Sequence, residues 1–194
     1  MMQFPKNEQR QSDRHKTIFI PACVEIDGTN YLAWLSDLSE SGAGFRSDLS
    51  PPLGKTMRYR TGNGEFREAM VKWTKPKSFG VAHLDKIADP FDRGDNKYRC
   101  VRVPLRHAAD VFLRGAKASA EVINVSPKGV CFETDARLER GSTVTLVVAG
   151  QAFENVTVRW QEGRKVGAQF AHGATYRTVE NLINNGSQLL AQTA

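Results

Sequence analysis

Asp37-Leu38-Ser39-Glu40-Ser41-Gly42 lies between two apolar stretches, Tyr31–Leu35 and Ala43–Phe45. Aspartate and serine side chains accept hydrogen bonds from backbone N–H groups two residues ahead, which closes a turn locally. Gly42 tolerates a positive φ angle and leaves room for another group to approach its backbone. The stretch therefore predicts a tight polar turn between two β-strands.

This turn occurs twice in the chain. Asn124-Val125-Ser126-Pro127-Lys128-Gly129 repeats it at an offset of 87 residues. The same offset relates further glycine, aromatic and valine pairs: Gly28 and Gly115, Phe45 and Phe132, Gly54 and Gly141, Phe66 and Phe153, Val71 and Val158, Trp73 and Trp160, and Gly80 and Gly167. One offset across so many such residues indicates a duplicated domain. We expect one copy in residues 1–90 and the other in residues 91–194.

Each copy has the pattern of an all-β domain. In the first copy, short segments with strand character are separated by turn formers, at residues 17–26, 30–36, 43–47, 55–60, 65–74 and 78–84. Short strands at regular spacing predict a small barrel or a sandwich. Domains of this size have modest cores, so we expect the two copies to pack together.

Two other segments lie outside the predicted strands. Residues 85–96 contain Asp89-Pro90 and suit a connector, with a short helix near 84–88. Residues 175–192 have apolar side chains at mostly helical spacing, which predicts a C-terminal helix interrupted at Gly186. Its apolar face would cover a barrel end or contact another chain.

We expect the three tryptophans to have structural roles and not to bind a ligand. Trp73 and Trp160 occupy equivalent strand positions, so we expect both in barrel cores. Trp34 has Glu121 at its counterpart position, and we expect it at a surface or an interface.

Composition indicates a soluble cytoplasmic protein. Apolar residues make up 40% and charged residues 25% of the chain, without an apolar run long enough for a membrane span. The first residues lack the apolar core of a secretory signal, and the three cysteines show no CxxC spacing. We expect no metal site, no cofactor and no enzymatic activity, since no metal-ligand spacing, nucleophile–base pair or glycine-rich phosphate loop is evident.

The positive charge is compatible with an anionic partner. Residues 1–90 carry 13 basic and 11 acidic side chains, and residues 91–194 carry 14 and 10. This excess is spread over both halves without a dense basic block, whereas proteins that bind polyanions usually have one. A small phosphate ligand is therefore favoured over DNA or RNA, neither of which we expect as a partner.

Two arginines precede the first predicted strand. Arg10 and Arg14 form an RxxxR pattern, which places two guanidinium groups within reach of one small ligand. The planar guanidinium binds phosphate or a guanine edge through paired hydrogen bonds and also stacks on bases. The pattern alone is common, and a basic N-terminal arm is the simpler interpretation.

Together with the turn, these arginines resemble the PilZ domain family of cyclic di-GMP receptors. The resemblance covers the first copy and the barrel part of the second, and extends to Ile18–Val24, Val71–Trp73 and Phe79–Val81. It implies a six-stranded antiparallel β-barrel followed by a helix, hence two tandem barrels and a C-terminal helix here. It also implies ligand-binding roles for Arg10 and Arg14 at the phosphates and a guanine, for Asp37 and Ser39 at guanine, and for Gly42 in the turn.

The second copy departs from this pattern. The offset places Lys97 and Val101, or with a one-residue slip Tyr98 and Arg102, where the first copy has its arginines. Arg99 and Arg102 form only RxxR, and Arg102 with Arg106 lies too close to the turn. The resemblance leaves a weaker second site at Arg102, Asn124, Ser126 and Gly129, where packing or turn chemistry is the favoured interpretation.

The leading hypothesis is a cyclic di-GMP receptor that changes conformation on binding and regulates a protein partner. The resemblance connects such receptors with motility, exopolysaccharide production or attachment. The alternative is a tandem protein-interaction module with a vestigial nucleotide site. Either function is compatible with a homodimer.

Overall fold

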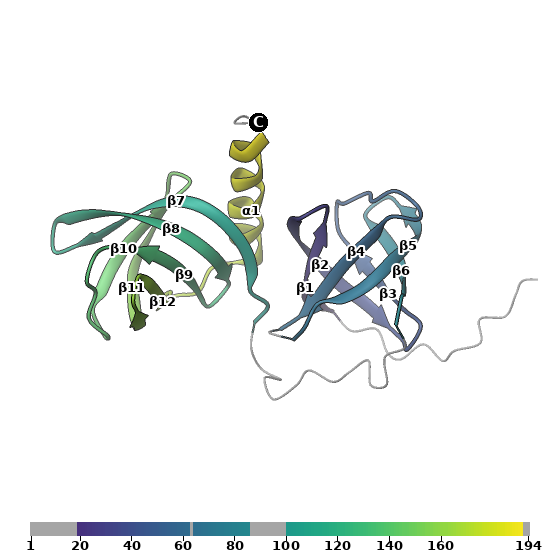
Figure 1. Cartoon of the computed structure of the whole chain (residues 1–194), viewed down its shortest axis with the longest axis horizontal. Helices are drawn as coiled ribbons and strands as arrows, with labels where there is room; N and C mark the ends of the chain where they lie inside the picture. The colour runs from purple at the N-terminus through teal and green to yellow at the C-terminus, as the bar shows by residue number, and fades with distance from the viewer. Residues whose placement is uncertain (1–18, 63, 86–99, 192–194) are drawn as a thin grey trace, which may run out of the picture.

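Two closed antiparallel barrels make up most of the computed structural model, which describes residues 19–62, 64–85 and 100–191, the last seven of these by their backbone alone (Figure 1). The first barrel is closed in the order β1-β2-β3-β6-β5-β4. Its strands are β1 (Ile20–Ile26), β2 (Thr29–Leu38), β3 (Gly42–Arg46), β4 (Thr56–Thr61), β5 (Arg67–Lys75) and β6 (Ser78–His83). All six match predicted segments to within three residues at each end.

The second barrel repeats this topology. Its strands are β7 (Val103–Leu113), β8 (Ala116–Ser126), β9 (Gly129–Thr134), β10 (Thr143–Val148), β11 (Gln151–Glu162) and β12 (Lys165–Gln169). They close in the order β7-β8-β9-β12-β11-β10, equivalent strand for strand to the first barrel. The predicted all-β fold of two tandem six-stranded antiparallel barrels is confirmed, and the choice between barrel and sandwich is decided.

Strand alternation sends some side chains into the first barrel and others toward its neighbour. In β1, Ala22 and Val24 belong to the first barrel's core, whereas Cys23 between them joins a buried cluster made mainly by the second barrel. Leu32, directly opposite Cys23 on β2, joins the same cluster. Because successive strand residues face opposite sides, β1 is buried on both faces.

Each barrel contains equivalent β-bulges. The β2 register shifts between Leu35 and Asp37, and the β5 register shifts between Val71 and Trp73. The second barrel has its counterparts between Val122 and Asn124 and between Val158 and Trp160. A bulge adds a residue to one strand and thereby changes which side chains face outward.

The bulge in β11 overturns the expectation that Trp160 lies in a core. Trp160 follows the added residue, leaves the inward alternation of Val156 and Val158, and is 36% exposed. Trp73 is only partly buried for the same reason. Both rings lie on the outside of their barrels.

Helix α1 (Tyr176–Ala191) follows the second barrel. Thr175 caps its start, because its hydroxyl accepts a hydrogen bond from the backbone N–H of Thr178 at 3.1 Å. The predicted interruption at Gly186 is wrong, since the helix runs through it; one helical glycine costs only about 1 kcal/mol relative to alanine. Val179, Leu182 and Ile183 form its buried stripe in the second barrel's cluster.

The helix lies between the barrels, and the two copies pack together as expected (Figure 1). The Trp34 ring of the first barrel meets the Tyr176 ring edge-on, with 4.9 Å between centroids, so Trp34 is an interface residue. Arg60 of β4 donates a hydrogen bond to the backbone carbonyl of Arg102 at 2.8 Å. The interface thus combines an apolar cluster, an aromatic pair and a charge-assisted hydrogen bond.

The connector is described only in part. Leu84 and Asp85 are not helical, and the rest of the expected short helix and the 90/91 boundary lie outside the described residues. Within the described chain, no helix has both the length and the apolar character needed to cross a bilayer.

Candidate functional site

The two polar turns have the same hydrogen bonds. The Ser39 hydroxyl donates to the carbonyl of Gly42 at 3.2 Å, and the Ser126 hydroxyl donates to that of Gly129 at 3.2 Å. Each turn is also hydrogen-bonded to the end of a neighbouring strand. The backbone N–H of His83 donates to the Ser41 carbonyl at 3.0 Å, and that of Phe170 donates to the Lys128 carbonyl at 3.1 Å. Both serines therefore stabilise turns by local chemistry.

The glycine of each turn is required by close packing. The sequence suggested that glycine is needed here because it tolerates a positive φ angle. Neither Gly42 nor Gly129 has a positive φ, so this reason is wrong. A Cβ on Gly42 would overlap the Val81 carbonyl, and a Cβ on Gly129 would overlap that of Ala168. Glycine is needed at both positions because the backbone of the neighbouring strand approaches closely, which was the other reason that the sequence suggested.

The turns differ in what holds their middle carbonyl. In the first copy the His83 Nδ1–H donates to the Glu40 carbonyl at 3.0 Å, while His83 Nε2 lies 2.7 Å from the Tyr59 hydroxyl. In the second copy the backbone N–H of Ala174 donates to the equivalent Pro127 carbonyl at 2.7 Å. An imidazole in one copy thus replaces a backbone amide in the other.

Asp37 and Asn124 have different surroundings. The Asp37 carboxylate lies over Gly44, where a Cβ would overlap it, and accepts a hydrogen bond from the Ser36 hydroxyl at 3.1 Å. Cys131 stands opposite Asn124, in the position of Gly44. Because Cys131 has a Cβ, the Asn124 side chain cannot adopt the arrangement of Asp37.

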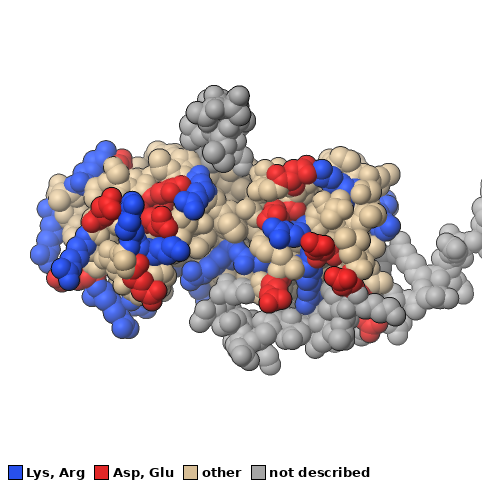
Figure 2. All heavy atoms as spheres, viewed as in Figure 1, with Lys and Arg blue, Asp and Glu red and all other residues tan. Residues whose placement is uncertain are grey.

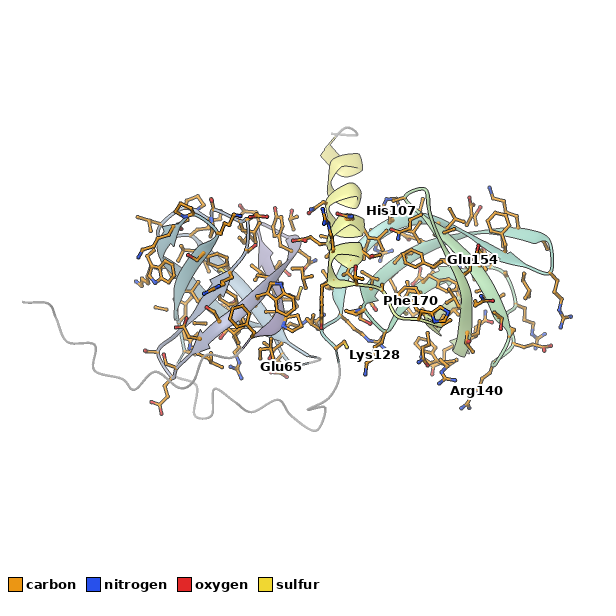
Figure 3. All side chains as sticks on the ribbon, turned by 180° about the vertical axis from the view of Figure 1, so that it is seen from behind. Glu65, His107, Lys128, Arg140, Glu154 and Phe170 are labelled. Atoms are coloured by element: carbon orange, nitrogen blue, oxygen red, sulfur yellow. The ribbon has the colours of Figure 1, made fainter. Side chains whose placement is uncertain are left out.

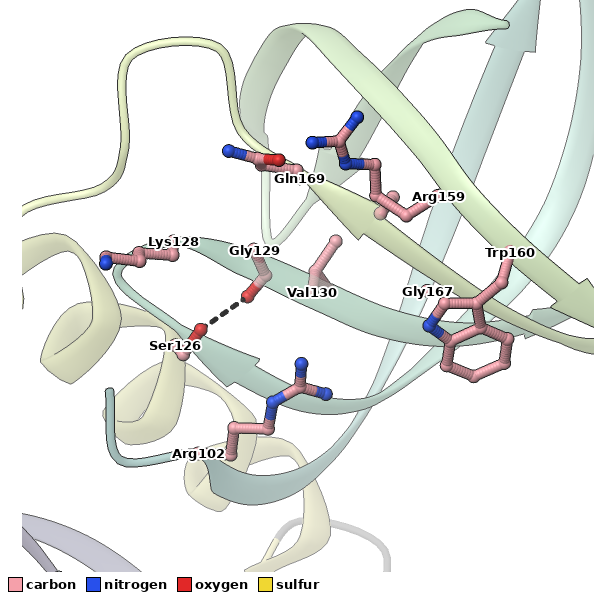
Figure 4. Close-up of a pocket in the computed structure, with 10 residues that line it drawn as sticks. Arg102, Ser126, Lys128, Gly129, Val130, Arg159, Trp160, Gly167 and Gln169 are labelled. Carbon is pink, nitrogen blue, oxygen red and sulfur yellow. Dashed lines mark hydrogen bonds between the residues drawn. The ribbon is translucent and has the colours of Figure 1, made fainter. Parts of the chain in front are cut away.

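A pocket of about 250 Å³ opens beside the second turn (Figure 4). Its walls come from the lead-in to β7, the β8–β9 turn, β11 and β12, and consist of Arg102, Ser126, Lys128, Gly129, Val130, Arg159, Trp160, Gly167, Ala168 and Gln169. The structure therefore brings together three of the predicted second-copy residues, Arg102, Ser126 and Gly129. Asn124, the fourth, does not line the pocket.

Three cationic side chains dominate the electrostatics of this pocket. Arg102, Lys128 and Arg159 are exposed, and within the described chain none of them forms a salt bridge. Figure 4 shows Arg102 and Arg159 on either side of Val130. Three cations around one concavity, with no salt-bridge partner among the described residues, favour an anionic ligand.

Arg102 also acts electrostatically on the buried thiol of Cys131. Burial raises the pKa of the Cys131 thiol, and the nearby Arg102 guanidinium opposes that rise. Two other arginines were considered with Arg102 in the sequence. Arg106 forms a salt bridge with Glu121 at 2.8 Å and does not line the pocket, and Arg99 lies outside the described residues.

Sequence reasoning missed Lys128, Arg159 and Trp160 as site residues. Arg159 is the added residue of the β11 bulge, so it and Trp160 both face outward, which strict alternation would not predict. The sequence does indicate the extra positive charge of the second copy. At the offset of 87, Lys128 stands where the first copy has Ser41, and Arg159 stands where it has Lys72.

The first copy is described only partly as a site. Asp37, Ser39 and Gly42 lie together at the end of β2 and the start of β3, whereas Arg10 and Arg14 lie outside the described residues. Among the described residues no cluster of histidine, cysteine or acidic side chains could hold a metal ion.

The solved structures similar to this chain show low sequence identity. PlzA of Borreliella burgdorferi in complex with c-di-GMP is 10% identical with a TM-score of 0.36, and the match covers 87% of each chain. The Bacillus subtilis inhibitor of motility, MotI/DgrA, is 12% identical with a TM-score of 0.39, covering 91% of this chain and 99% of that one. Escherichia coli YcgR in complex with c-di-GMP is 10% identical with a TM-score of 0.35, covering 90% and 85%.

A family comparison locates the relationship in the second copy. No curated protein matches the chain in sequence. Residues 96–185 match the model of the PilZ domain, a range that contains all six strands of the second barrel and the start of α1. The chain therefore carries a PilZ domain, and its second barrel forms it.

Proposed function

We propose that this chain is a cyclic di-GMP receptor that holds its ligand in the pocket of the second barrel. The observation that carries the proposal is the set of three cations, Arg102, Lys128 and Arg159, around the turn of a PilZ domain. Cyclic di-GMP has two phosphodiester charges and two guanines. Guanidinium groups bind phosphate oxygens and guanine edges through paired hydrogen bonds, and Lys128 adds a third positive charge.

The other walls of the pocket suit a guanine base. Trp160 presents an exposed indole, and stacking of a base on an aromatic ring contributes about 1–3 kcal/mol. The Gln169 amide offers both a donor and an acceptor. A volume of about 250 Å³ is below the roughly 300–1,000 Å³ usual for ligand pockets, so the pocket holds one part of the dinucleotide.

The first copy is proposed as a separate ligand site, formed by Arg10, Arg14, Asp37, Ser39 and Gly42. Its support is the sequence pattern and the Asp37 carboxylate beside the turn, where it can accept hydrogen bonds from guanine. Lys72 and Ser41 stand at the positions of Arg159 and Lys128. These two positions hold one cation in the first copy and two in the second, so the first-copy site depends on Arg10 and Arg14.

The proposed output is a change in the surface shown to a protein partner in the cytoplasm, without enzymatic turnover. A ligand shifts a conformational equilibrium only by binding one state more tightly. Nucleic acid is not the proposed ligand: on the face in Figure 2, basic and acidic side chains are interspersed over both barrels, without the continuous basic stripe that such binding needs.

Isothermal titration calorimetry of the full chain with cyclic di-GMP tests the proposal. We expect binding by the wild type, weakened by about 10- to 100-fold in Arg102→Ala and in Arg159→Ala, since each loses charge-assisted hydrogen bonds. Arg140→Ala is the matched control, because Arg140 is exposed on the same barrel and does not line the pocket (Figure 3). Absence of wild-type binding, or equal affinity in all three variants, would contradict the proposed site.

A further inference from the structure

We propose that Arg60 of the first barrel is a positioning residue for the ligand-binding Arg102 of the second. The inference rests on the proposed function and concerns the regulation of the same pocket. The Arg60 Nη2 group donates to the carbonyl oxygen of Arg102 at 2.8 Å, across 42 residues of sequence and from one barrel to the other. A cation from the first barrel thus holds the backbone of a pocket residue.

The backbone at Arg102 is suited to control by this contact. Val101 and Val103, on either side, are 1% and 0% exposed, so both neighbours are fixed in the core and the Arg102 side chain points outward. Arg102 precedes the first residue of β7, so its carbonyl lies where the barrel ladder begins. The bond from Arg60 fixes the peptide from which the pocket guanidinium extends.

Arg60 is itself held in place on the outer face of β4. Its guanidinium lies over the Phe66 ring, with 4.7 Å from Cζ to the centroid, and Phe66 packs against the second barrel's apolar cluster. Arg60 stands opposite Cys23 on β1. Burial raises the pKa of the Cys23 thiol to about 11, although the Arg60 charge opposes this rise. Arg60 Nε is buried without a hydrogen-bond acceptor in the described chain.

The Arg60–Arg102 bond has a charged donor. Such a hydrogen bond is stronger than one between neutral groups, and its loss leaves the Arg102 carbonyl without that donor. Docking of the first barrel therefore orients a ligand contact in the second. By linkage, ligand binding through Arg102 favours the docked arrangement of the barrels to the same extent.

Arg58 provides a matched control on the same strand. It also faces outward and lies over Phe66, with 5.1 Å from Cζ to the centroid. Its hydrogen bonds, however, go to Glu25 within the first barrel, at 2.6 and 3.1 Å. A methionine at either position keeps much of the side-chain volume and removes the donor.

Calorimetric titrations of full-length variants with cyclic di-GMP test this inference. We expect Arg60→Met to weaken binding about tenfold, Arg60→Lys to restore most of the affinity, and Arg58→Met to stay within about twofold of the wild type. General unfolding would lower the number of sites per chain and would not be rescued by lysine. Thermal unfolding of each variant identifies any that does not fold.

Three results would overturn the inference, each in a distinguishable way. Wild-type binding with an unchanged affinity in Arg60→Met would remove the positioning role and leave the proposed function intact. Equal weakening in Arg58→Met and Arg60→Met would reduce the effect to general packing around Phe66. Absence of wild-type binding would overturn the proposed function and this inference together.

Discussion

The indole of Trp160 lies directly against Gly167 on the neighbouring strand, and no side chain larger than hydrogen fits between them. A Cβ on Gly167 would overlap the Nε1 side of the ring. Trp73 and Gly80 repeat this contact in the first barrel. A feature that looks like core packing in the sequence is thus an aromatic platform on the outside of each barrel.

Gly167→Ala should displace the Trp160 ring and alter the pocket. Trp160 is partly exposed and its ring can move, so the free energy of unfolding should fall by only about 1 kcal/mol. Affinity for cyclic di-GMP should fall as well, because the stacking platform shifts. Urea unfolding and calorimetric titration of the same variant measure the two effects, and unchanged affinity would show that the ring does not contact the ligand.

Gly129→Ala should destabilise the chain more than Gly167→Ala does. Its Cβ would overlap the backbone carbonyl of Ala168, which cannot move away as a side chain can. We expect a loss of about 2–3 kcal/mol in the free energy of unfolding, measured by urea unfolding of both variants. Equal losses would contradict the close strand approach at this turn.

His83 should make the stability of the first barrel depend on pH. Burial lowers the pKa of His83 below its ordinary 6.5, and the Arg67 charge acts in the same direction, while the bond to the Glu40 carbonyl opposes them. The unfolded chain therefore binds a proton more readily than the folded one. The contribution of His83 to the free energy of unfolding should be fully present above about pH 6.5 and should be lost as the pH falls below that value.

Urea unfolding between pH 5 and 7.5 measures this dependence. His83→Gln should reduce the slope of stability against pH below 6.5, because the titrating group is gone. The wild type losing no stability over that range, or the variant keeping the full slope, would contradict the role of His83.

Trp34→Ala should weaken the contact between the barrels. Removal of the ring loses its edge-on contact with Tyr176 and part of the covered interface, and we expect about 1–2 kcal/mol less stability. Tyr176→Phe keeps the ring contact and should have a smaller effect. Differential scanning calorimetry should show the barrels unfolding less cooperatively in Trp34→Ala; an unchanged single transition would contradict the interface.

The sequence was sufficient to predict the fold and the duplicated turns. Glycine and aromatic residues at a constant offset identified two copies, and the polar turns at Asp37–Gly42 and Asn124–Gly129 marked equivalent strand ends. These features depend on local chemistry, which the residue types specify directly. The reason for glycine at position 42 depends on a strand distant in sequence, and only the tertiary structure reveals it.

The site could be predicted only in part. The arginine pattern favours the first copy, whereas the described pocket and the family match both fall on the second. Arg159 and Trp160 reach the pocket through a bulge that shifts the strand register, and periodicity alone cannot locate such a bulge. Arg10 and Arg14 lie outside the described residues, so their ligand-binding role stays a prediction.

A crystal structure of the full chain grown with cyclic di-GMP would show whether the second barrel holds the ligand. We expect ligand density in the second barrel, with a phosphate beside Arg102 and Arg159 and a guanine against Trp160. Additional density at the Asp37–Gly42 turn would support the first-copy site as well. Density confined to the first barrel, or no density at saturating ligand, would contradict the proposed site in the second barrel.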